Sequence, residues 1–588
     1  MGQQRLAPTG PFKNALTSPH SQPIVRILQP MAATIVCVSQ EAPFWEPLVQ
    51  VWSSARRCFS TALSKRVRNG PAMSGASLLL VLACAGAVAG QAAPMQCPPP
   101  YDISPCACGV KKNGLDILCE FTDSQHITKA MTLLKERPST VIFYLKLRHN
   151  SLPKLPRFVF LGLDIRHLTI HNSSLAVIEE SSLSSIGLGR PNATGRPPCH
   201  PQPTRGCGRG RTCGKGLTQL DLSQNHLSLI PSAAFHNLHH LILLNLNHNR
   251  ISALRARAFE GLDTLEILTL YENKLHAVDP EAFKGLEKKL KRLNLGGNEL
   301  TAVPVHALNI LDTLKKLEMQ ENRITEISEG DFAGLRSLDS LGLAHNMLKE
   351  VPGRVFSHLT LLNSLELDGN QITHIDPEAF AGLEENLQYL RLGDNNIHTV
   401  PSEALRRLHR LRHLDLRANN ISSISDDAFL GFGDTITFLN LQKNDIKILP
   451  AMVFDNLNSL ETLNLQNNKL THIPEEVMEP IMDTLRVVDI MDNPLICDCE
   501  LRWYNDWLRQ LRDRDDAALQ NKHTLCTMPH EHREYSIRNM PLDKMSCVGK
   551  NMGQTAMTGG ARRADAQRTP VLAALAAALA AAELALRV

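Results

Sequence analysis

The sequence predicts an α/β solenoid, a horseshoe of stacked, similar turns with parallel strands on its concave face. Three observations predict this fold class. The pattern L-x-x-L-x-L-x-x-N occurs twelve times between Leu217 and Asn493, at a step of 24 or 25 residues. Its alternating leucines are typical of a short strand with one buried side. One turn cannot bury these leucines alone, whereas stacked turns bury them continuously.

An asparagine closes each of the twelve patterns. These residues are Asn225, Asn249, Asn273, Asn298, Asn322, Asn346, Asn370, Asn395, Asn419, Asn444, Asn468 and Asn493. The side-chain amide both donates and accepts hydrogen bonds. A column of such amides can pair backbone groups that would otherwise be buried without a partner. We therefore expect an asparagine ladder along the turns.

Two further sets of the pattern lie upstream, so about fourteen repeats span residues 141–493. They consist of Ile142, Leu145, Leu147 and Asn150, followed by Ile165, Leu168, Ile170 and Ser173, where serine replaces asparagine.

The second half of most repeats carries a phenylalanine in register. These residues are Phe235, Phe259, Phe283, Phe332, Phe356, Phe380, Phe429 and Phe454, while Leu308, Leu405 and Met478 take the position elsewhere. We expect a buried spine on the convex side. The alternative is an aromatic binding stripe.

The repeats resemble the leucine-rich repeat family, and the flanking cysteines resemble the caps of its extracellular members. That group includes connectin, chaoptin, chondroadherin and the repeat modules of Slit. Residues 97–140 would form the N-terminal cap, for which the resemblance implies disulfides Cys97–Cys108 and Cys106–Cys119. A four-cysteine metal site is the alternative, but it lacks a C-x-x-C spacing.

Residues 494–548 resemble the C-terminal cap of the same family. The resemblance implies disulfides Cys497–Cys526 and Cys499–Cys547. Trp503 and Trp507 are four residues apart, so they share a helix face with Leu511 nearby. We expect that face to seal the last repeat. A zinc site with His530 and His532 is the alternative, and we predict no metal and no cofactor.

The N-terminal part contains a secretion signal rather than a folded domain. Residues 1–72 form a leader of uncertain status that shows no useful periodicity. The apolar run from Leu78 to Val88, which follows Met73, predicts a signal peptide over 73–89. Translation starting at Met73 explains this position; a long leader with basic Lys65–Arg68 and a transit peptide are alternatives. Residues 1–89 hold eight basic and two acidic residues, so without them the net charge is 3 − 6 = −3.

Residues 190–215 interrupt the period. The segment is rich in glycine, proline and arginine, with six basic residues, no acidic residue, and Cys199, Cys207 and Cys213. Such a composition cannot bury a core, so we expect a disordered loop or a splicing artefact. The glycine spacing in 208–215 does not match a phosphate-binding loop. Without the segment the net charge is −3 − 6 = −9, which argues against a nucleic-acid partner.

Glycosylation and lipid anchoring are both predicted. N-x-S/T sequons occur at Asn172, Asn192 and Asn420. In residues 549–588, small residues around Gly559 precede a polar spacer and an apolar, alanine-rich end. That order matches a GPI-anchor signal with Gly559 as the attachment site. Plain secretion and a short membrane span are alternatives.

The candidate ligand-binding residues lie at outward positions in and after the strands of the middle repeats. They are Glu318, Gln320, Glu366, Asp368, Arg391, Asp415 and Arg417. Solenoids use this extended face for binding, whereas ordinary solvation is the alternative for any single residue. No catalytic pattern such as G-x-S-x-G, H-E-x-x-H or a Walker motif occurs, so we expect a protein that is not an enzyme.

The resemblance implies an extracellular adhesion or recognition protein, at the cell surface or secreted. It would bind a protein ligand or cell-surface receptor, including another copy of itself, through the concave face. The alternatives are a secreted matrix or innate-immunity scaffold, and a non-catalytic subunit of a secreted enzyme.

Overall fold

The computed structural model describes residues 96–136, 141–184, 186, 216–510 and 524–541. All of them belong to the unit Pro94–Val588. The expected leader 1–72, signal peptide 73–89, insertion 190–215 and tail 549–588 lie outside the described residues. The structure therefore informs on the repeat array and on its two caps.

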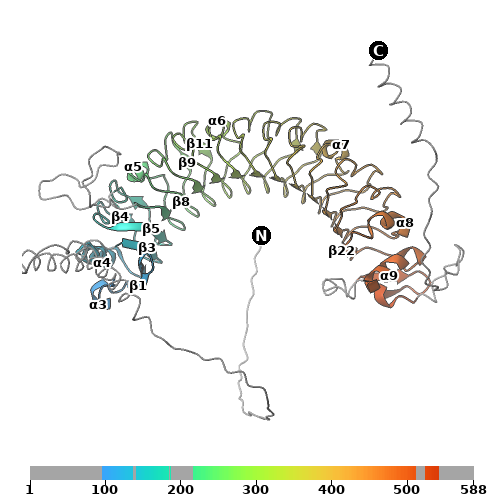
Figure 1. The fold of residues 1–588 in the computed structure, drawn as a ribbon, viewed down its shortest axis with the longest axis horizontal. Coiled ribbons are helices and arrows are strands. Elements are labelled where there is room, and N and C mark those ends of the chain that lie inside the picture. The colour runs from blue at the N-terminus through green and yellow to red at the C-terminus, as the bar shows by residue number, and fades with distance from the viewer. Residues whose placement is uncertain (1–95, 137–140, 185, 187–215, 511–523, 542–588) are drawn as a thin grey trace, which may run out of the picture. The chain divides into compact units, whose positions relative to one another are not determined.

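One sheet of sixteen strands runs through the described part of the chain. The hairpin β1–β2 is antiparallel, and pairing is parallel from β2 onward. Fourteen strands, β3 to β22 in the order of the sheet, begin one repeat each. Figure 1 shows these strands along the inner side of the coil, with α5, α6 and α7 on the outer side. The predicted parallel-strand solenoid of fourteen turns is confirmed.

Most strands of this sheet have only three residues, because each turn leaves the sheet after one L-x-L core. The sheet consists of β1 (Ala107–Lys111), β2 (Gly114–Glu120), β3 (Val141–Arg148), β5 (Asp164–His171), β7 (Gln219–Asp221), β8 (Leu243–Asn245), β10 (Ile267–Thr269), β12 (Arg292–Asn294), β13 (Lys316–Glu318), β14 (Ser340–Gly342), β16 (Ser364–Glu366), β18 (Tyr389–Arg391), β19 (His413–Asp415), β20 (Phe438–Asn440), β21 (Thr462–Asn464) and β22 (Val487–Asp489).

The outer side of the coil consists of turns, two-residue strands and short helices. The small pairs are β4 (Lys154–Leu155) with β6 (Val177–Ile178), β9 (Ala253–Leu254) with β11 (Ala277–Val278), and β15 (Glu350–Val351) with β17 (His374–Ile375). The helices are α5 (Ser232–Phe235), α6 (Val305–Leu308), α7 (Ser402–Leu405) and α8 (Glu475–Met478), followed by η1 (Glu479–Ile481). Each of these four α-helices directly follows a proline.

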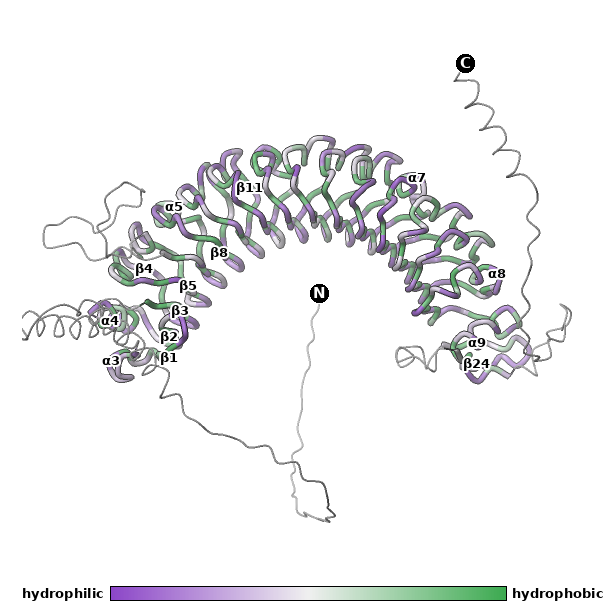
Figure 2. The backbone as a smooth tube through the Cα atoms, in the orientation of Figure 1, coloured by the Kyte–Doolittle hydropathy of each residue, from purple (hydrophilic) through white to green (hydrophobic). Residues whose placement is uncertain are grey.

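From β3 onward, successive strands pair without offset, so each core leucine lies beside its equivalent in the next turn. Leu268 pairs with Leu293, and Leu293 pairs with Leu317. All three are fully buried. Burial of a leucine contributes roughly 1.5–3 kcal/mol. Figure 2 shows apolar stretches recurring in the turns along the coil. This continuous core takes the place of a single globular core.

The phenylalanines form a second buried column. All eight are at most 2% exposed, as are Leu308, Leu405 and Met478. Neighbouring rings stack, as for Phe259 and Phe283, whose centroids are 6.0 Å apart. The buried spine is confirmed, and an aromatic binding stripe at these positions is excluded.

The asparagine ladder is continuous from Asn225 to Asn493. In a typical turn, Asn322 Nδ2 donates to the carbonyl oxygens of Leu295 and Met319, both at 3.0 Å. Its Oδ1 accepts from the Leu300 backbone N–H at 3.1 Å. The ladder therefore connects neighbouring turns through buried backbone groups, as expected from the amide chemistry.

The N-terminal end of the array is closed by a disulfide-bonded hairpin and a helix. The cap contains α3 (Pro100–Ile103), the hairpin β1–β2 and α4 (Ser124–Lys135). Disulfides join Cys97 to Cys108 and Cys106 to Cys119. The hairpin extends the main sheet by the two strands β2 and β1, and β2 covers the open edge of the first repeat.

The C-terminal end is closed by η2 (Cys499–Leu501), α9 (Arg502–Gln510), the hairpin β23 (Leu525–Met528) with β24 (Arg533–Ser536), and η5 (Ile537–Asn539). A disulfide joins Cys497 to Cys526. Cys499 is also disulfide-bonded, and its expected partner Cys547 lies outside the described residues.

Helix α9 seals the last repeats with aromatic side chains. Trp503 and Trp507 are at most 4% exposed. Trp503 Nε1 donates to the Ile473 carbonyl oxygen at 2.8 Å. Tyr504, which the sequence reasoning did not single out, is fully buried and donates to the Val488 carbonyl oxygen at 3.3 Å. Leu511 lies outside the described residues.

Candidate functional site

The concave face is formed by strand residues whose neighbours in the strand are buried. Side chains alternate along a strand, so in β18 the burial of Leu390 directs Tyr389 and Arg391 outward. Four candidate residues are the last residues of their strands: Glu318, Glu366, Arg391 and Asp415. The other three lie two residues after the end of a strand: Gln320, Asp368 and Arg417.

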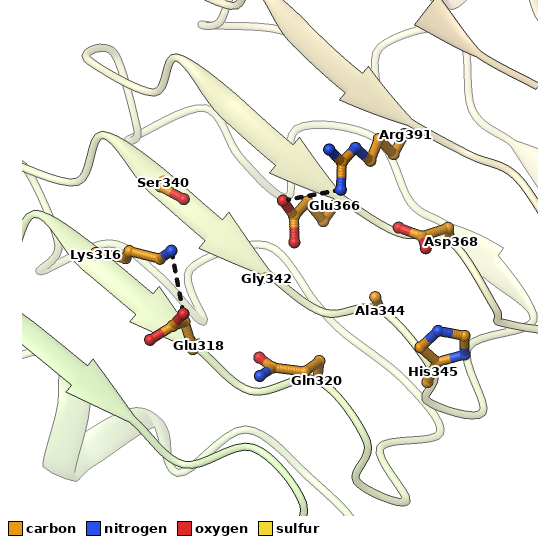
Figure 3. Close-up of a pocket in the computed structure, with 10 residues that line it drawn as sticks. All are labelled: Lys316, Glu318, Gln320, Ser340, Gly342, Ala344, His345, Glu366, Asp368 and Arg391. Carbon is orange, nitrogen blue, oxygen red and sulfur yellow. Dashed lines mark hydrogen bonds and ion pairs between the residues drawn. The ribbon is translucent and has the colours of Figure 1, made fainter. Parts of the chain in front are cut away.

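A hollow of about 220 Å³ lies in the middle of this face (Figure 3). Its lining residues come from four successive turns and are Lys316, Glu318, Gln320, Ser340, Gly342, Ala344, His345, Glu366, Asp368 and Arg391. Five of the seven candidate residues are among them. Asp415 and Arg417 lie on the next turn and do not line it.

Ion pairs across neighbouring turns neutralise two acidic side chains of the hollow. Glu318 contacts both Arg292, at 3.0 Å, and Lys316, at 3.1 Å. Glu366 contacts Arg391 at 3.4 Å. These partners lie on adjacent strands or on the same strand, because the in-register sheet aligns their positions.

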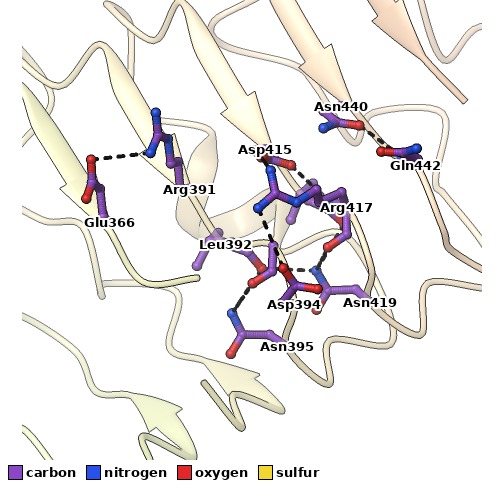
Figure 4. Close-up of polar contacts among 12 residues, drawn as sticks. Glu366, Arg391, Leu392, Asp394, Asn395, Asp415, Arg417, Asn419, Asn440 and Gln442 are labelled. Atoms are coloured by element: carbon purple, nitrogen blue, oxygen red, sulfur yellow. Dashed lines mark hydrogen bonds and ion pairs between the residues drawn. The ribbon is translucent and has the colours of Figure 1, made fainter. Parts of the chain in front are cut away.

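Asp415 and Arg417 form a separate cluster beside the hollow (Figure 4). The Asp415 side chain is only 4% exposed. It accepts from the Arg417 backbone N–H at 3.0 Å and from Arg417 Nη1 at 2.9 Å. Burial raises the pKa of Asp415, and the hydrogen bond and charge from Arg417 oppose that shift. Arg417 also contacts Asp394 at 3.6 Å, so this cluster is satisfied internally.

Asp368 differs from the other acidic residues of the face. The residue is 9% exposed, and its buried Oδ1 has no hydrogen-bond partner among the described residues. Figure 3 shows its carboxylate directed toward the centre of the hollow.

Three aromatic rings form a row that the sequence reasoning missed. Tyr389, His413 and Phe438 are register partners at the first position of β18, β19 and β20. The His413 and Phe438 rings stack with centroids 4.0 Å apart, and Tyr389 is 45% exposed. Burial, with a smaller contribution from Arg391, lowers the pKa of His413 to about 4. The sequence signal that could have revealed this row is the recurrence of aromatic residues at one repeat position, at spacings of 24 and 25 residues.

On the turns that begin with β20 and β21, the side chains that follow the strands on the concave face are the amides Gln442 and Gln466. Gln442 Nε2 donates to Gln466 Oε1 at 2.5 Å, and Gln466 Nε2 donates to Asp492 Oδ2 at 2.9 Å. The concave face therefore changes along the array from a charged hollow to an aromatic row and then to an amide row.

The sequon residues Asn172 and Asn420 are exposed in the structure, so both are accessible for modification. Asn192 and the expected anchor site Gly559 lie outside the described residues. Among the residues that the structure describes, no cluster of three or more His, Cys, Asp or Glu side chains is arranged to hold a metal.

Stacked parallel turns with an asparagine ladder and disulfide-bonded ends define a solenoid repeat protein. The sequence matches the leucine rich repeat family in seven overlapping segments that together run from residue 215 to 495. The protein belongs to the leucine-rich repeat family, as the resemblance implied.

The solved structures that are similar to this chain include the following three. A leucine-rich repeat protein of Leptospira interrogans is 24% identical, covering 64% of this chain and 78% of the other, with a TM-score of 0.43. A chain of the octameric complex of Latrophilin 3, Unc5D and the repeats of FLRT2 is 23% identical, covering 57% and 91%, with a TM-score of 0.43. A chain of the Drosophila Toll–Spatzle complex is 17% identical, covering 74% and 75%, with a TM-score of 0.43. No curated protein matches the chain.

Within the described ranges, no helix combines the length and the apolar character that a membrane crossing requires.

Proposed function

We propose that this protein is an extracellular recognition and adhesion protein that docks a protein ligand on the concave face. The observation that carries the proposal is the exposed Tyr389, in an aromatic row beside Arg391 on that face. Tyrosine and arginine dominate the binding energy of protein interfaces, because they combine apolar area with directional hydrogen bonds. Solvation alone does not account for a large aromatic ring on this face.

The extracellular location is supported by the disulfides at both ends of the array. Structural disulfides persist in oxidising compartments and are rare in the cytosol. The exposed sequon residues Asn172 and Asn420 fit a secreted or cell-surface protein. The signal peptide over 73–89 and a GPI anchor at Gly559 complete the proposal.

The test is cell-surface capture by the purified full chain, with ligand-bearing cells found by flow cytometry. Tyr389→Ala should weaken capture at least tenfold, because truncation of a hot-spot aromatic typically costs more than about 2 kcal/mol. Met452→Ala is the matched control, since Met452 is 59% exposed in a turn between β20 and β21. Equal capture by both variants, or no capture of any surface protein, would contradict the proposed function.

A further inference from the structure

Asp368 is the acidic side chain of the hollow that lacks a cationic partner among the described residues. Glu318 is paired with Arg292 and Lys316, and Glu366 is paired with Arg391. The lining holds three acidic side chains and two basic ones, Lys316 and Arg391. With Arg292, which lies outside the lining, three cations serve Glu318 and Glu366, and none of the three forms an ion pair with Asp368.

The burial of Asp368 makes its lack of a partner unfavourable for the isolated protein. The residue is 9% exposed, and its buried Oδ1 accepts no hydrogen bond from the part of the chain that the structure describes. A buried carboxylate without a partner destabilises the folded state. Native proteins hold few such groups, and each needs a reason.

The lysine and arginine side chains of the hollow and of the next turn are already engaged, and Lys316 contacts Glu318 at 3.1 Å. Arg391 contacts Glu366 at 3.4 Å. Arg417 contacts Asp415 at 2.9 Å and Asp394 at 3.6 Å. A cation for Asp368 must therefore come from outside this network.

The hollow has room for an entering side chain because Gly342 lacks one. A Cβ atom placed on Gly342 would lie 3.5 Å from Gln320 Oε1 and 3.8 Å from Glu366 Oε2. These oxygens and the Asp368 carboxylate surround the opening (Figure 3). Three surrounding oxygen acceptors suit a group that only donates hydrogen bonds, as guanidinium and ammonium groups do.

We propose that the hollow receives a single lysine or arginine side chain of the docked protein, which pairs with Asp368. This inference rests on the proposed docking function and specifies its partner chemistry. Burial of the pair on binding excludes water and strengthens the attraction. Asp368 thereby serves recognition at a cost to the stability of the free protein.

The experiment uses two phage-displayed peptide libraries, with five random positions on each side of a fixed arginine or a fixed glutamine. Both are panned on the mature protein from expressing cells, collected from the medium or released from the surface by phosphatidylinositol-specific phospholipase C. We expect enrichment from the arginine library alone. Titration of an enriched peptide should show at least tenfold weaker binding to Asp368→Asn and at most a twofold change for Asp427→Asn. Asp427 is the matched control because it is an exposed aspartate already paired with Arg406.

A stability measurement separates recognition from a structural role. Asp368→Asn should raise the melting temperature of the free protein, because the unpaired buried charge is removed. A lower melting temperature would show that Asp368 acts as a structural residue, which overturns the proposal. Equal enrichment of both libraries, enrichment of neither, or unchanged peptide binding by Asp368→Asn would also overturn it.

Two further arms distinguish the remaining outcomes. Calcium chloride that raises the melting temperature of the wild type, but not of Asp368→Asn, would assign the hollow to a metal ion and contradict the inference. Peptide binding that is lost in Tyr389→Ala but retained in Asp368→Asn would leave the docking function standing and refute only the role of Asp368.

Discussion

Single asparagine residues hold neighbouring turns together. Each ladder amide of the array makes hydrogen bonds to buried backbone groups of its own turn and of the preceding turn, as Asn322 does. The residue before it, Glu321, has φ of 57°, so the chain bends sharply just before the amide. The ladder is therefore a structural device, and its residues do not face a ligand.

Asn322→Leu should lower the free energy of unfolding by roughly 2–4 kcal/mol. Leucine leaves the Leu300 N–H buried without its partner, which costs about 1–3 kcal/mol. It also removes one of the two amide donors from the carbonyl oxygens of Leu295 and Met319, which keep their bonds from Asn298 and Asn346. Urea unfolding monitored by circular dichroism measures the change. Asn396→Leu is the control, because Asn396 is the exposed neighbour of a ladder residue; an equal loss in both variants would refute the ladder argument.

His413 should make stability depend on pH. Its folded pKa of about 4 lies below the ordinary histidine value of 6.5. The unfolded chain therefore binds more protons between these values, and stability is lost as pH falls from about 6.5 toward 4. His413→Phe should remove a component on the order of 1 kcal/mol from that loss, after allowance for solvent screening. Denaturation midpoints at pH 7 and pH 4.5 test this, and an unchanged difference between them would contradict it.

At the scale of elements, the caps protect the ends of the array from fraying. Trp503 on α9 packs on the last repeats and donates to Ile473. Trp503→Ala should cost about 3–5 kcal/mol, as other buried tryptophan truncations do. Since solenoid repeats contact mainly their neighbours, amide hydrogen exchange should accelerate in β21 and β22 but not in β8. Arg502→Ala, an exposed substitution on the same helix, should leave all three strands unchanged.

The elements also show what could be predicted from the sequence. The 24- or 25-residue period fixes the number of strands and the buried positions, because burial follows from alternation along each L-x-L core. The period also places outward residues such as Glu366 and Asp368 on the concave face. Which side chains pair there depends on contacts between turns. The unpaired state of Asp368 and the stacking of His413 on Phe438 could not be read from a single repeat.

At the scale of the whole molecule, attachment to the membrane is the proposed role of residues 549–588. Phosphatidylinositol-specific phospholipase C should release at least half of the surface protein from expressing cells, because a GPI anchor is its only attachment in the proposal. Gly559→Arg should reduce surface display several-fold, because anchor attachment requires a small residue. Protein found only in the medium before treatment would instead indicate plain secretion.

The uniform pairing of strands has a consequence for how such a protein changes in length. Each turn offers the next one equivalent apolar contacts and equivalent amide bonds, so the same side of one turn can replace that of another. Excision of residues 323–346, from one ladder position to the next, would rejoin equivalent surfaces. Recombination can thus shorten or extend the concave face by whole turns, while both caps and the remaining contacts between turns are preserved.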